Sequence, residues 1–376
     1  MDKIVGNFIL TSCGLSILTN MAKELNFDEN IYKYSNYTEK EFPKEKKEKF
    51  DKFIKDVKEK LLKFNLSELK ETSAELNALI NFYQNDIKNF PEMDYHYFLH
   101  TDTYLGKKVA EILIELFKNK GITNVESITA KDLKTSSFEE FQISLSDLAK
   151  NLVNEIIKPF KSGGYKIIFN LTGGFKSINS FLQTVASLYA DESIYIFETS
   201  ENLLRIPRLP IKIEEGIFKE NLNLFRMLEL GIYQDVIKEE IDKLPEIVYL
   251  KIDNGFAMSP WGELIWQNIK DEVYKERLVE PISKRIEMST QLKKQFESLN
   301  PSERLQLNKK IDDLEICIER NFQDCKKSLR FHELKGNISE TYQYEIYPFD
   351  GNDNRRLYIK SKDGKYILDK IDAHLK

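Results

Sequence analysis

The sequence predicts an α/β protein, with a doubly wound parallel sheet in residues 1–205 and an α+β arrangement in residues 283–376. In the first part, strand-like apolar runs alternate with helix-patterned segments, which is typical of parallel sheets. In the last part, two helical patterns are followed by four short segments of alternating apolar and polar residues, which is typical of an antiparallel meander. A chain of 376 residues is too long for one ordinary core, so two or three domains are expected.

The N-terminal elements follow one another in a regular order. Strands are expected over residues 3–12, 94–103, 166–174 and 192–199, and helices over 15–25, 105–119 and from Ser177 onward. Between the first expected helix and the second expected strand, the segment of about residues 28–90 is rich in lysine and glutamate and has helical periodicity. This segment predicts a helical insertion outside the sheet, with its charges on a solvated face and no catalytic role.

Polar connecting segments, here called joints, lie at the ends of three of the expected strands, at 11–20, 100–106 and 170–177. In doubly wound sheets, ligands bind beyond the carboxyl ends of the strands, so these joints are candidates for one shared pocket. Gly173 and Gly174 allow unusual backbone angles, Lys176 adds a positive charge, and Ser177 can cap the helix. Together they suit an anionic oxygen, although neither common nucleotide-binding fingerprint is present. Simple helix capping by the hydroxyl residues is the alternative for each joint.

The middle segment, 206–282, is mostly helical up to Pro245, then has a strand at 248–252, a turn, and a helix beginning at Ser259 with Pro260 in its first turn. The last part begins with a helical hairpin broken at Asn300–Pro301, with Ser302 able to start the second helix. Strands are then expected over 328–336, 341–349, 355–361 and 365–375.

Composition limits the class of protein. The net charge of -5 argues against nonspecific nucleic-acid binding by the chain as a whole, so any such surface is expected to be regional. The three cysteines have neither a paired framework nor zinc-type spacing, which suits free thiols in a reducing cytoplasm. Polar residues interrupt the opening apolar run, and no segment reaches the length of a membrane helix, so a cytoplasmic protein without membrane contact is expected.

The joints "TSCGLSILTN" at 11–20 and "NLTGGFKS" at 170–177 resemble the paired ligand-binding motifs of CARF domains, the Rossmann-like sensors of type III CRISPR systems. The resemblance covers residues 1–205 and implies a homodimer that binds a cyclic oligoadenylate across its two-fold axis. With the joint after the 94–103 strand included, the implied ligand-binding residues are Thr11, Ser12, Cys13, Gly14, Ser16, Thr19, Asn20, Thr101, Asp102, Thr172, Gly173, Gly174, Phe175, Lys176 and Ser177.

Residues 206–282 resemble the small winged-helix modules that often follow CARF domains. Winged helices commonly bind DNA through a basic helix. This segment is instead acidic, with Glu239, Glu240, Asp242, Glu246 and Asp253. A linker or dimerisation module is therefore expected.

The stretches "LRFHELKGN", "RRLYI" and "IDAHL" resemble the RelE/ParE toxin superfamily over residues 283–376. RelE-type members cleave mRNA in the ribosomal A site, and ParE-type members poison gyrase. Metal-free RNA cleavage needs a group that takes the 2'-hydroxyl proton, cations for the phosphorane charge, and a proton for the leaving oxygen. The resemblance implies catalytic roles for Arg330, His332, Lys335, Arg356 and His374, and RNA binding by Tyr347, Arg355 and Lys376.

Two points in this part stay open. Lys335 suits an rRNA phosphate as well as catalysis. Glu345 and tyrosines occupy a strand where some relatives carry lysines, and Tyr347 is a candidate for stacking on a base.

The resemblances together predict a CRISPR ancillary effector. Cyclic oligoadenylate is its expected allosteric activator, no cofactor or metal is expected, and the ribosome and mRNA are its expected partners. The effector would be a metal-independent, ribosome-dependent endoribonuclease that blocks translation. The alternatives are a CARF–winged-helix transcription regulator with a degenerate toxin-like tail, and a ribonuclease that does not need the ribosome.

Overall fold

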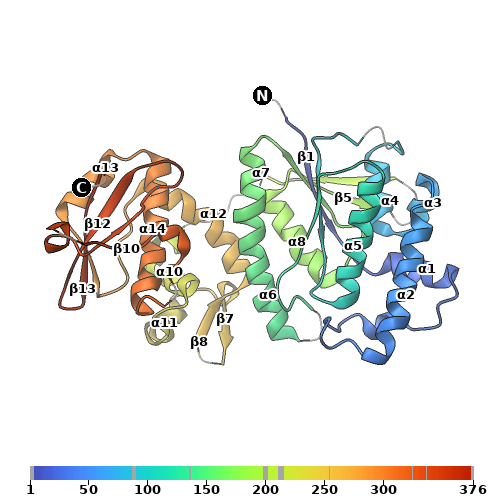
Figure 1. Cartoon of the computed structure of the whole chain (residues 1–376), viewed down its shortest axis with the longest axis horizontal. Coiled ribbons are helices and arrows are strands. Elements are labelled where there is room, and N and C mark those ends of the chain that lie inside the picture. Colours follow the sequence, from blue (N-terminus) through green and yellow to red (C-terminus); the bar gives the residue numbers. More distant parts are fainter. Residues whose placement is uncertain are drawn as a thin grey trace. The chain divides into compact units, whose positions relative to one another are not determined.

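The computed structural model describes residues 4–86, 90–134, 137–197, 202–210, 216–253, 255–323, 325–335 and 337–373. The chain forms two compact units, Met1–Lys212 and Ile213–Lys376, and both mix helices with a sheet (Figure 1). The expected α/β class is therefore confirmed. The division of the chain into the three proposed domains stays a prediction.

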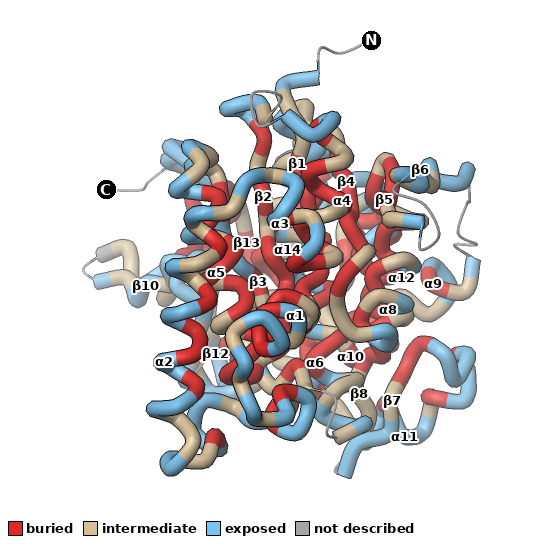
Figure 2. Tube along the Cα trace, turned by 90° about the vertical axis from the view of Figure 1, so that its right-hand side faces the viewer, coloured by how far each residue is buried: buried red, intermediate tan, exposed pale blue. Residues whose placement is uncertain are grey.

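The first unit is built on a six-stranded sheet in the order β3-β2-β1-β4-β5-β6. Strands β1 to β5 are parallel, and β6 runs antiparallel to β5. Figure 2 shows the central strands β1 and β4 as buried, as expected for parallel strands covered on both faces. The strands are β1 (Asn7–Ser12), β2 (Tyr95–Leu99), β3 (Val125–Ile128), β4 (Lys166–Asn170), β5 (Glu192–Ile196) and β6 (Leu203–Pro207).

The direction of this strand order reverses between β1 and β4, where chain crossovers leave in opposite directions. Such a switch point is where doubly wound sheets bind ligands. The four expected strands and three expected helices are all present, while β3, β6 and the long helical stretch before β4 are additional. The helices are α1 (Ser16–Glu24), α5 (Tyr104–Asn119), α6 (Phe138–Asn151), a π-helical turn (Leu152–Ile157), α7 (Lys158–Ser162) and α8 (Lys176–Tyr189).

The insertion is helical and outside the sheet, as predicted. It contains a 3-10 turn at Ile31–Tyr34 and the helices α2 (Lys44–Leu61), α3 (Leu66–Thr72) and α4 (Ala74–Phe82). The charged residues of α2 form only one face, because Phe50, Phe53 and Val57 are buried in the core of the unit. Helix α4 packs against β4, β5 and β6, so the insertion reaches the middle of the sheet.

The second unit begins with helices and a small hairpin. These are α9 (Gly216–Glu220), α10 (Leu222–Leu230), α11 (Gln234–Glu240), two 3-10 turns (Ile241–Lys243 and Glu246–Val248), β7 (Tyr249–Ile252), β8 (Gly255–Met258) and α12 (Pro260–Glu276). Ser259 caps α12 by accepting the Gly262 N–H at 3.0 Å, and Pro260 is in the first turn, as predicted. The residues expected only as a turn before Ser259 include strand β8, which pairs with β7.

The rest of this unit is a helical hairpin against a five-stranded sheet in the order β10-β11-β12-β13-β9. The antiparallel meander is confirmed, and β9 adds an unforeseen strand parallel to β13. The elements are β9 (Ile286–Met288), α13 (Thr290–Ser298), α14 (Pro301–Glu319), two 3-10 turns (Lys327–Leu329 and Asn337–Glu340), β10 (His332–Glu333), β11 (Tyr344–Ile346), β12 (Arg355–Lys362) and β13 (Lys365–Ala373).

Two predicted helix starts are wrong. Ser302 does not begin α14, because Asn300 caps it in a capping box with Glu303, and Pro301 takes the first helical position. Ser177 does not cap α8, because the helix begins one residue earlier and Phe175 occupies the cap position without a side-chain hydrogen bond.

The expectation of three free thiols is also wrong. Cys317 and Cys325 form a disulfide, and only Cys13 is free among the described cysteines. The cause is local, since Asn321 and Phe322 adopt positive φ angles just after α14 and turn the chain back toward it. Spacing alone did not indicate this reversal.

A buried ionic cluster ties α10 and α12 to α14 within the second unit. Arg226, which is fully buried, donates to Asp312 at 2.7 Å and to Glu315 at 2.8 Å. Lys270 pairs with Glu229 at 2.7 Å and with Asp312 at 3.2 Å. Breaking one partner of such a cluster would leave a buried charge uncompensated, so these helices are expected to move together.

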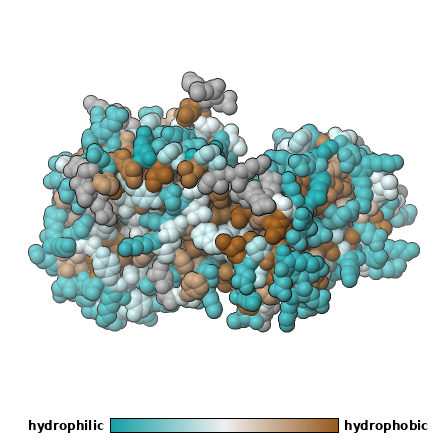
Figure 3. Space-filling model, turned by 180° about the vertical axis from the view of Figure 1, so that it is seen from behind, coloured by the Kyte–Doolittle hydropathy of each residue, from teal (hydrophilic) through white to brown (hydrophobic). Residues whose placement is uncertain are grey.

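The outer surface is mainly hydrophilic on both units in the view of Figure 3, in agreement with a charged fraction of 31%. Within the part of the chain that the structure describes, no helix has the length and apolar character needed to span a membrane.

Candidate functional site

The two joints that resemble CARF motifs meet at the switch point of the first unit's sheet. Gly14 follows β1 and Gly174 follows β4, which are neighbouring strands. A methyl group placed on Gly14 would lie 2.8 Å from the Gly174 nitrogen, and one on Gly174 would lie 2.0 Å from Ser12 Oγ. Gly174 also has a φ of +95°, which disfavours other residues. The close contact of the two loops therefore requires both glycines.

The residues at the end of β1 are buried. Thr11 and Ser12 are at most 1% exposed, and their hydroxyls have no hydrogen-bond partner among the described residues. Burial, and then the charge of Glu75, raise the pKa of the Cys13 thiol. This end of the strand thus holds two buried hydroxyls without a partner among the described residues, and that of Ser12 lies against Gly174 of the neighbouring loop.

The next residues of this joint, Thr19 and Asn20, lie on α1. The Thr19 hydroxyl donates to the Ser16 carbonyl at 3.1 Å, and the Asn20 amide donates to the Thr72 carbonyl at 3.2 Å. The first contact lies within α1, and the second fixes α1 against the last residue of α3. They account for both side chains without a ligand.

The joint after β4 exposes its helix start. Thr172 Oγ1 accepts the Ile196 N–H at 3.1 Å, so this hydroxyl anchors the loop to β5, and Phe175 packs on the core. Lys176 and Ser177 are exposed in the first turn of α8. Because no side chain caps α8, its first N–H groups and the Lys176 ammonium together form the best candidate here for binding phosphate.

The joint after β2 is on the other side of β1 from β4. Thr103 caps α5 by accepting the Gly106 N–H at 3.1 Å, and Thr101 is 2% exposed with its hydroxyl 2.9 Å from that of Thr103. Asp102 accepts the Asp132 N–H at 2.9 Å. The capping alternative therefore describes the contacts of this joint.

Sequence reasoning missed Glu75, which lies between the two loops. It comes from the first turn of α4 and is 1% exposed. Its carboxylate accepts the Gly14 N–H at 2.6 Å, the Ser16 hydroxyl at 2.9 Å and the Ser73 hydroxyl at 2.5 Å. A methyl group on Gly173 would lie 2.1 Å from the same carboxylate. A glutamate in the first turn of a helix is ordinary, so the sequence carried no signal for this role.

In the second unit, three of the proposed active-site residues lie around a fourth, Tyr347. The guanidinium carbons of Arg356 and Arg330 lie 3.4 Å and 4.8 Å from the centroid of the Tyr347 ring, and the His332 ring centroid lies 6.1 Å away. The pairing of β10, β11 and β12 causes this, since His332 pairs with Glu345 and Leu357 with Ile346. His332 on β10 and Arg356 on β12, with Arg330 just before β10 and Tyr347 just after β11, thereby form one cationic and aromatic row across the sheet.

Arg356 is held more firmly than the other groups of this row. It is 9% exposed, and its Nε lies 3.7 Å from Glu345 Oε1, an ion pair too long for a hydrogen bond. Arg330 and His332 are exposed. The row therefore combines one fixed guanidinium with two groups that solvent can reach.

The remaining proposed residues lie elsewhere. Arg355 points away from Arg356, as alternation along a strand requires, and pairs with Glu303 and Asp353. Both carboxylates have lowered pKa values, chiefly through the Arg355 hydrogen bonds. Lys335 is exposed. His374 and Lys376 fall outside the described residues.

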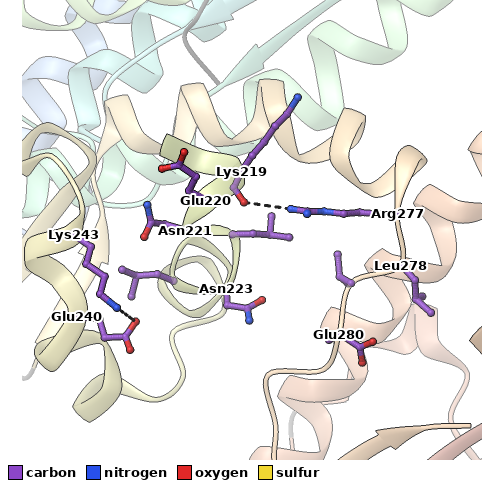
Figure 4. A pocket seen from close by; sticks show the side chains of 12 residues that line it. Lys219, Glu220, Asn221, Asn223, Glu240, Lys243, Arg277, Leu278 and Glu280 are labelled. Carbon is purple, nitrogen blue, oxygen red and sulfur yellow. Dashed lines mark hydrogen bonds and ion pairs between the residues drawn. The ribbon is translucent and has the colours of Figure 1, made fainter. Parts of the chain in front are cut away.

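A cavity of about 450 Å³ lies in the second unit beside the start of α10 (Figure 4). Most of its charged groups are already engaged. Lys243 pairs with Glu240 at 3.1 Å, the Arg277 guanidinium donates to the Lys219 carbonyl at 3.4 Å, and Glu280 pairs with Lys293 outside the cavity. This mixed lining gives the cavity no distinct ligand chemistry.

Among the described residues, no group of three or more His, Cys, Asp or Glu side chains is arranged to hold a metal ion.

Comparison with known proteins gives one result. Residues 70–209 match the model of a family described as CRISPR-associated protein (Cas_APE2256). The matched stretch contains Glu75, the joint after β2 and the joint after β4, while the second unit lies beyond it. None of the curated proteins matches the chain. The family match supports an association with CRISPR systems.

Proposed function

We propose that the first unit is a dimeric sensor of a cyclic oligoadenylate and that the second unit is a metal-independent endoribonuclease activated by this ligand. The observation that carries the sensor proposal is the meeting of the two motif loops at the switch point, beside the uncapped start of α8. The CRISPR-associated family match over residues 70–209 is in accord with it.

The ligand class is the one that the CARF resemblance implies, and the chemistry of the site is in accord with it. A cyclic oligoadenylate repeats the same phosphate and ribose around a ring. A two-fold symmetric dimer repeats each protein group, so one α8 start and one Lys176 from each subunit would receive equivalent phosphates. The buried hydroxyls of Thr11 and Ser12 would add donors if the loops separate on binding.

The nuclease proposal rests on the row around Tyr347. Cleavage by the RNA's own 2'-hydroxyl develops negative charge on the phosphorus oxygens, which two adjacent guanidiniums can stabilise. His332 lies at the edge of the row and is the side-chain type suited to proton transfer near neutral pH. Because Arg330 and Arg356 already lie over the Tyr347 ring, we assign Tyr347 to holding the arginines instead of stacking on a base.

Isothermal calorimetry with the full chain and a panel of cyclic oligoadenylates tests the sensor. We expect one ring to bind per dimer. Lys176→Ala should weaken binding by more than the 0.2–1 kcal/mol or so of one exposed ion pair, because each dimer loses two contacts. Lys118→Ala, in the last turn of α5 at the opposite edge of the sheet, is the matched control and should bind as the wild type does. Equal affinity of wild type and Lys176→Ala would exclude the phosphate role of this loop.

The β7–β8 hairpin between helices favours one rival function, a winged-helix transcription regulator. Gel-shift assays on a random DNA library, with and without the ring, separate the two. Tight and ring-dependent DNA binding would support the regulator, and its absence is expected because this segment is acidic.

A further inference from the structure

The start of α1 already has an anion, supplied by the protein. Gly14 lies just before this helix, and its N–H donates to Glu75, as does the Ser16 hydroxyl in the first turn. Helix starts attract negative charge because their N–H groups point outward unpaired. The start of α8 on the neighbouring strand has no such side-chain partner. The two halves of the candidate site therefore differ in charge.

The segment carrying Glu75 is firmly attached to both halves. The Asn170 amide at the end of β4 donates to the Glu75 carbonyl at 3.1 Å, and the Ala74 N–H contacts the Ser16 hydroxyl at 3.4 Å. The carboxylate lies against Gly173. A substitution at Glu75 would thus alter contacts of both the Gly14 loop and the Gly173 loop.

An unused hydrogen-bonding group lies in the same pair of loops, against the glycine that follows Gly173. Ser12 is 1% exposed, its hydroxyl has no partner among the described residues, and it is directed at Gly174. Burying an unpaired hydroxyl is costly. Such a group indicates a place where a ligand atom is accommodated in another state of the loops.

We propose that Glu75 is an autoinhibitory anion, which occupies the cradle between the Gly14 and Gly173 loops and competes there with the phosphates of the ligand. The ligand class rests on the proposed sensor function. A buried negative charge repels a polyanion, so binding requires the ligand to overcome or displace Glu75. The contact would keep the sensor inactive at low ligand concentration.

Glu75→Gln is the decisive variant, because glutamine keeps an acceptor for the Gly14 N–H but removes the charge. Calorimetry with cyclic tetra-adenylate and the full chain should show an affinity gain of about three- to thirtyfold, as expected for one charge several ångströms away in a partly screened site. Glu71→Gln removes the same charge from an exposed position of α3 and should leave the affinity unchanged. Unchanged or weaker binding by Glu75→Gln alone would overturn the proposal and leave Glu75 as a structural contact.

A second measurement separates this proposal from the choice of ligand. Glycine-selective ¹⁵N labelling places reporters on Gly14, Gly173 and Gly174, and inorganic phosphate is the probe. Saturable shifts of these amides in Glu75→Gln and none in the wild type are expected even if no cyclic oligoadenylate binds. Identical responses of the two proteins to phosphate would contradict the competition.

Discussion

At the scale of single residues, Arg356 makes the most testable contribution to the second unit. It is nearly buried and held by the Tyr347 ring and Glu345, so its guanidinium is preorganised. Arg356→Ala should lower the rate of RNA cleavage triggered by cyclic oligoadenylate by a factor of about 10²–10³. This is the usual effect of losing one preorganised donor to a developing anion. Single-turnover cleavage measures this, and Lys362→Ala at the far end of β12 is the control. Wild-type cleavage by Arg356→Ala would remove this residue from the active site.

His96 on β2 predicts a pH dependence of stability. It is 1% exposed among aromatic rings, and burial lowers its pKa from 6.5 to about 3. As the pH falls below 6.5, the His96 imidazole therefore binds a proton in the unfolded chain but not in the folded chain. The free energy of unfolding then decreases by about 1.4 kcal/mol per pH unit. Between pH 6.5 and 5, urea unfolding followed by circular dichroism should show about 2 kcal/mol less loss for His96→Phe than for the wild type. Parallel pH profiles would contradict this.

At the scale of elements, the start of α14 depends on Asn300. Its side chain accepts the Glu303 N–H at 3.0 Å, and the Glu303 carboxylate accepts the Asn300 N–H at 3.0 Å. Asn300→Ala should destabilise the second unit by about 1 kcal/mol, while Ser302→Ala should change little. Both tryptophans of the chain lie in this unit, so denaturation followed by tryptophan fluorescence reports it directly. Equal effects of the two variants would indicate that the cap contributes nothing.

Some helices, strands and contacts could be predicted from the sequence, and others could not. Long runs with clear periodicity, such as the strand at β4 and the helix at α5, lie where they were expected. Strand β9 was missed because three residues are too few to show alternation. Glu75 was missed because its partner Gly14 is 61 positions away, and no local pattern encodes such a contact. The joint after β2 likewise could be assigned to capping only once its partners were visible.

At the scale of the whole molecule, the proposed function places a sensor in the first unit and a nuclease in the second. The family match lies within the first unit, and the Tyr347 row lies in the second. The buried cluster around Arg226 and Asp312 couples α10, α12 and α14, so a change that reaches the helices of the second unit would be passed to the helix that supports its sheet. Sensing and cleavage should therefore separate by mutation, with Lys176 affecting the first and Arg356 the second.

In the proposed function, a cyclic oligoadenylate switches on RNA cleavage by this chain. The most direct measurement adds the full chain and a panel of such rings to a translation extract with a reporter mRNA, and maps new RNA ends by primer extension. We predict that new ends appear only when one of the rings is present and that they disappear when ribosomes are removed. Cleavage that persists without ribosomes would leave a ring-activated nuclease acting on free RNA. No new ends with any ring, or the same ends without one, would contradict the account.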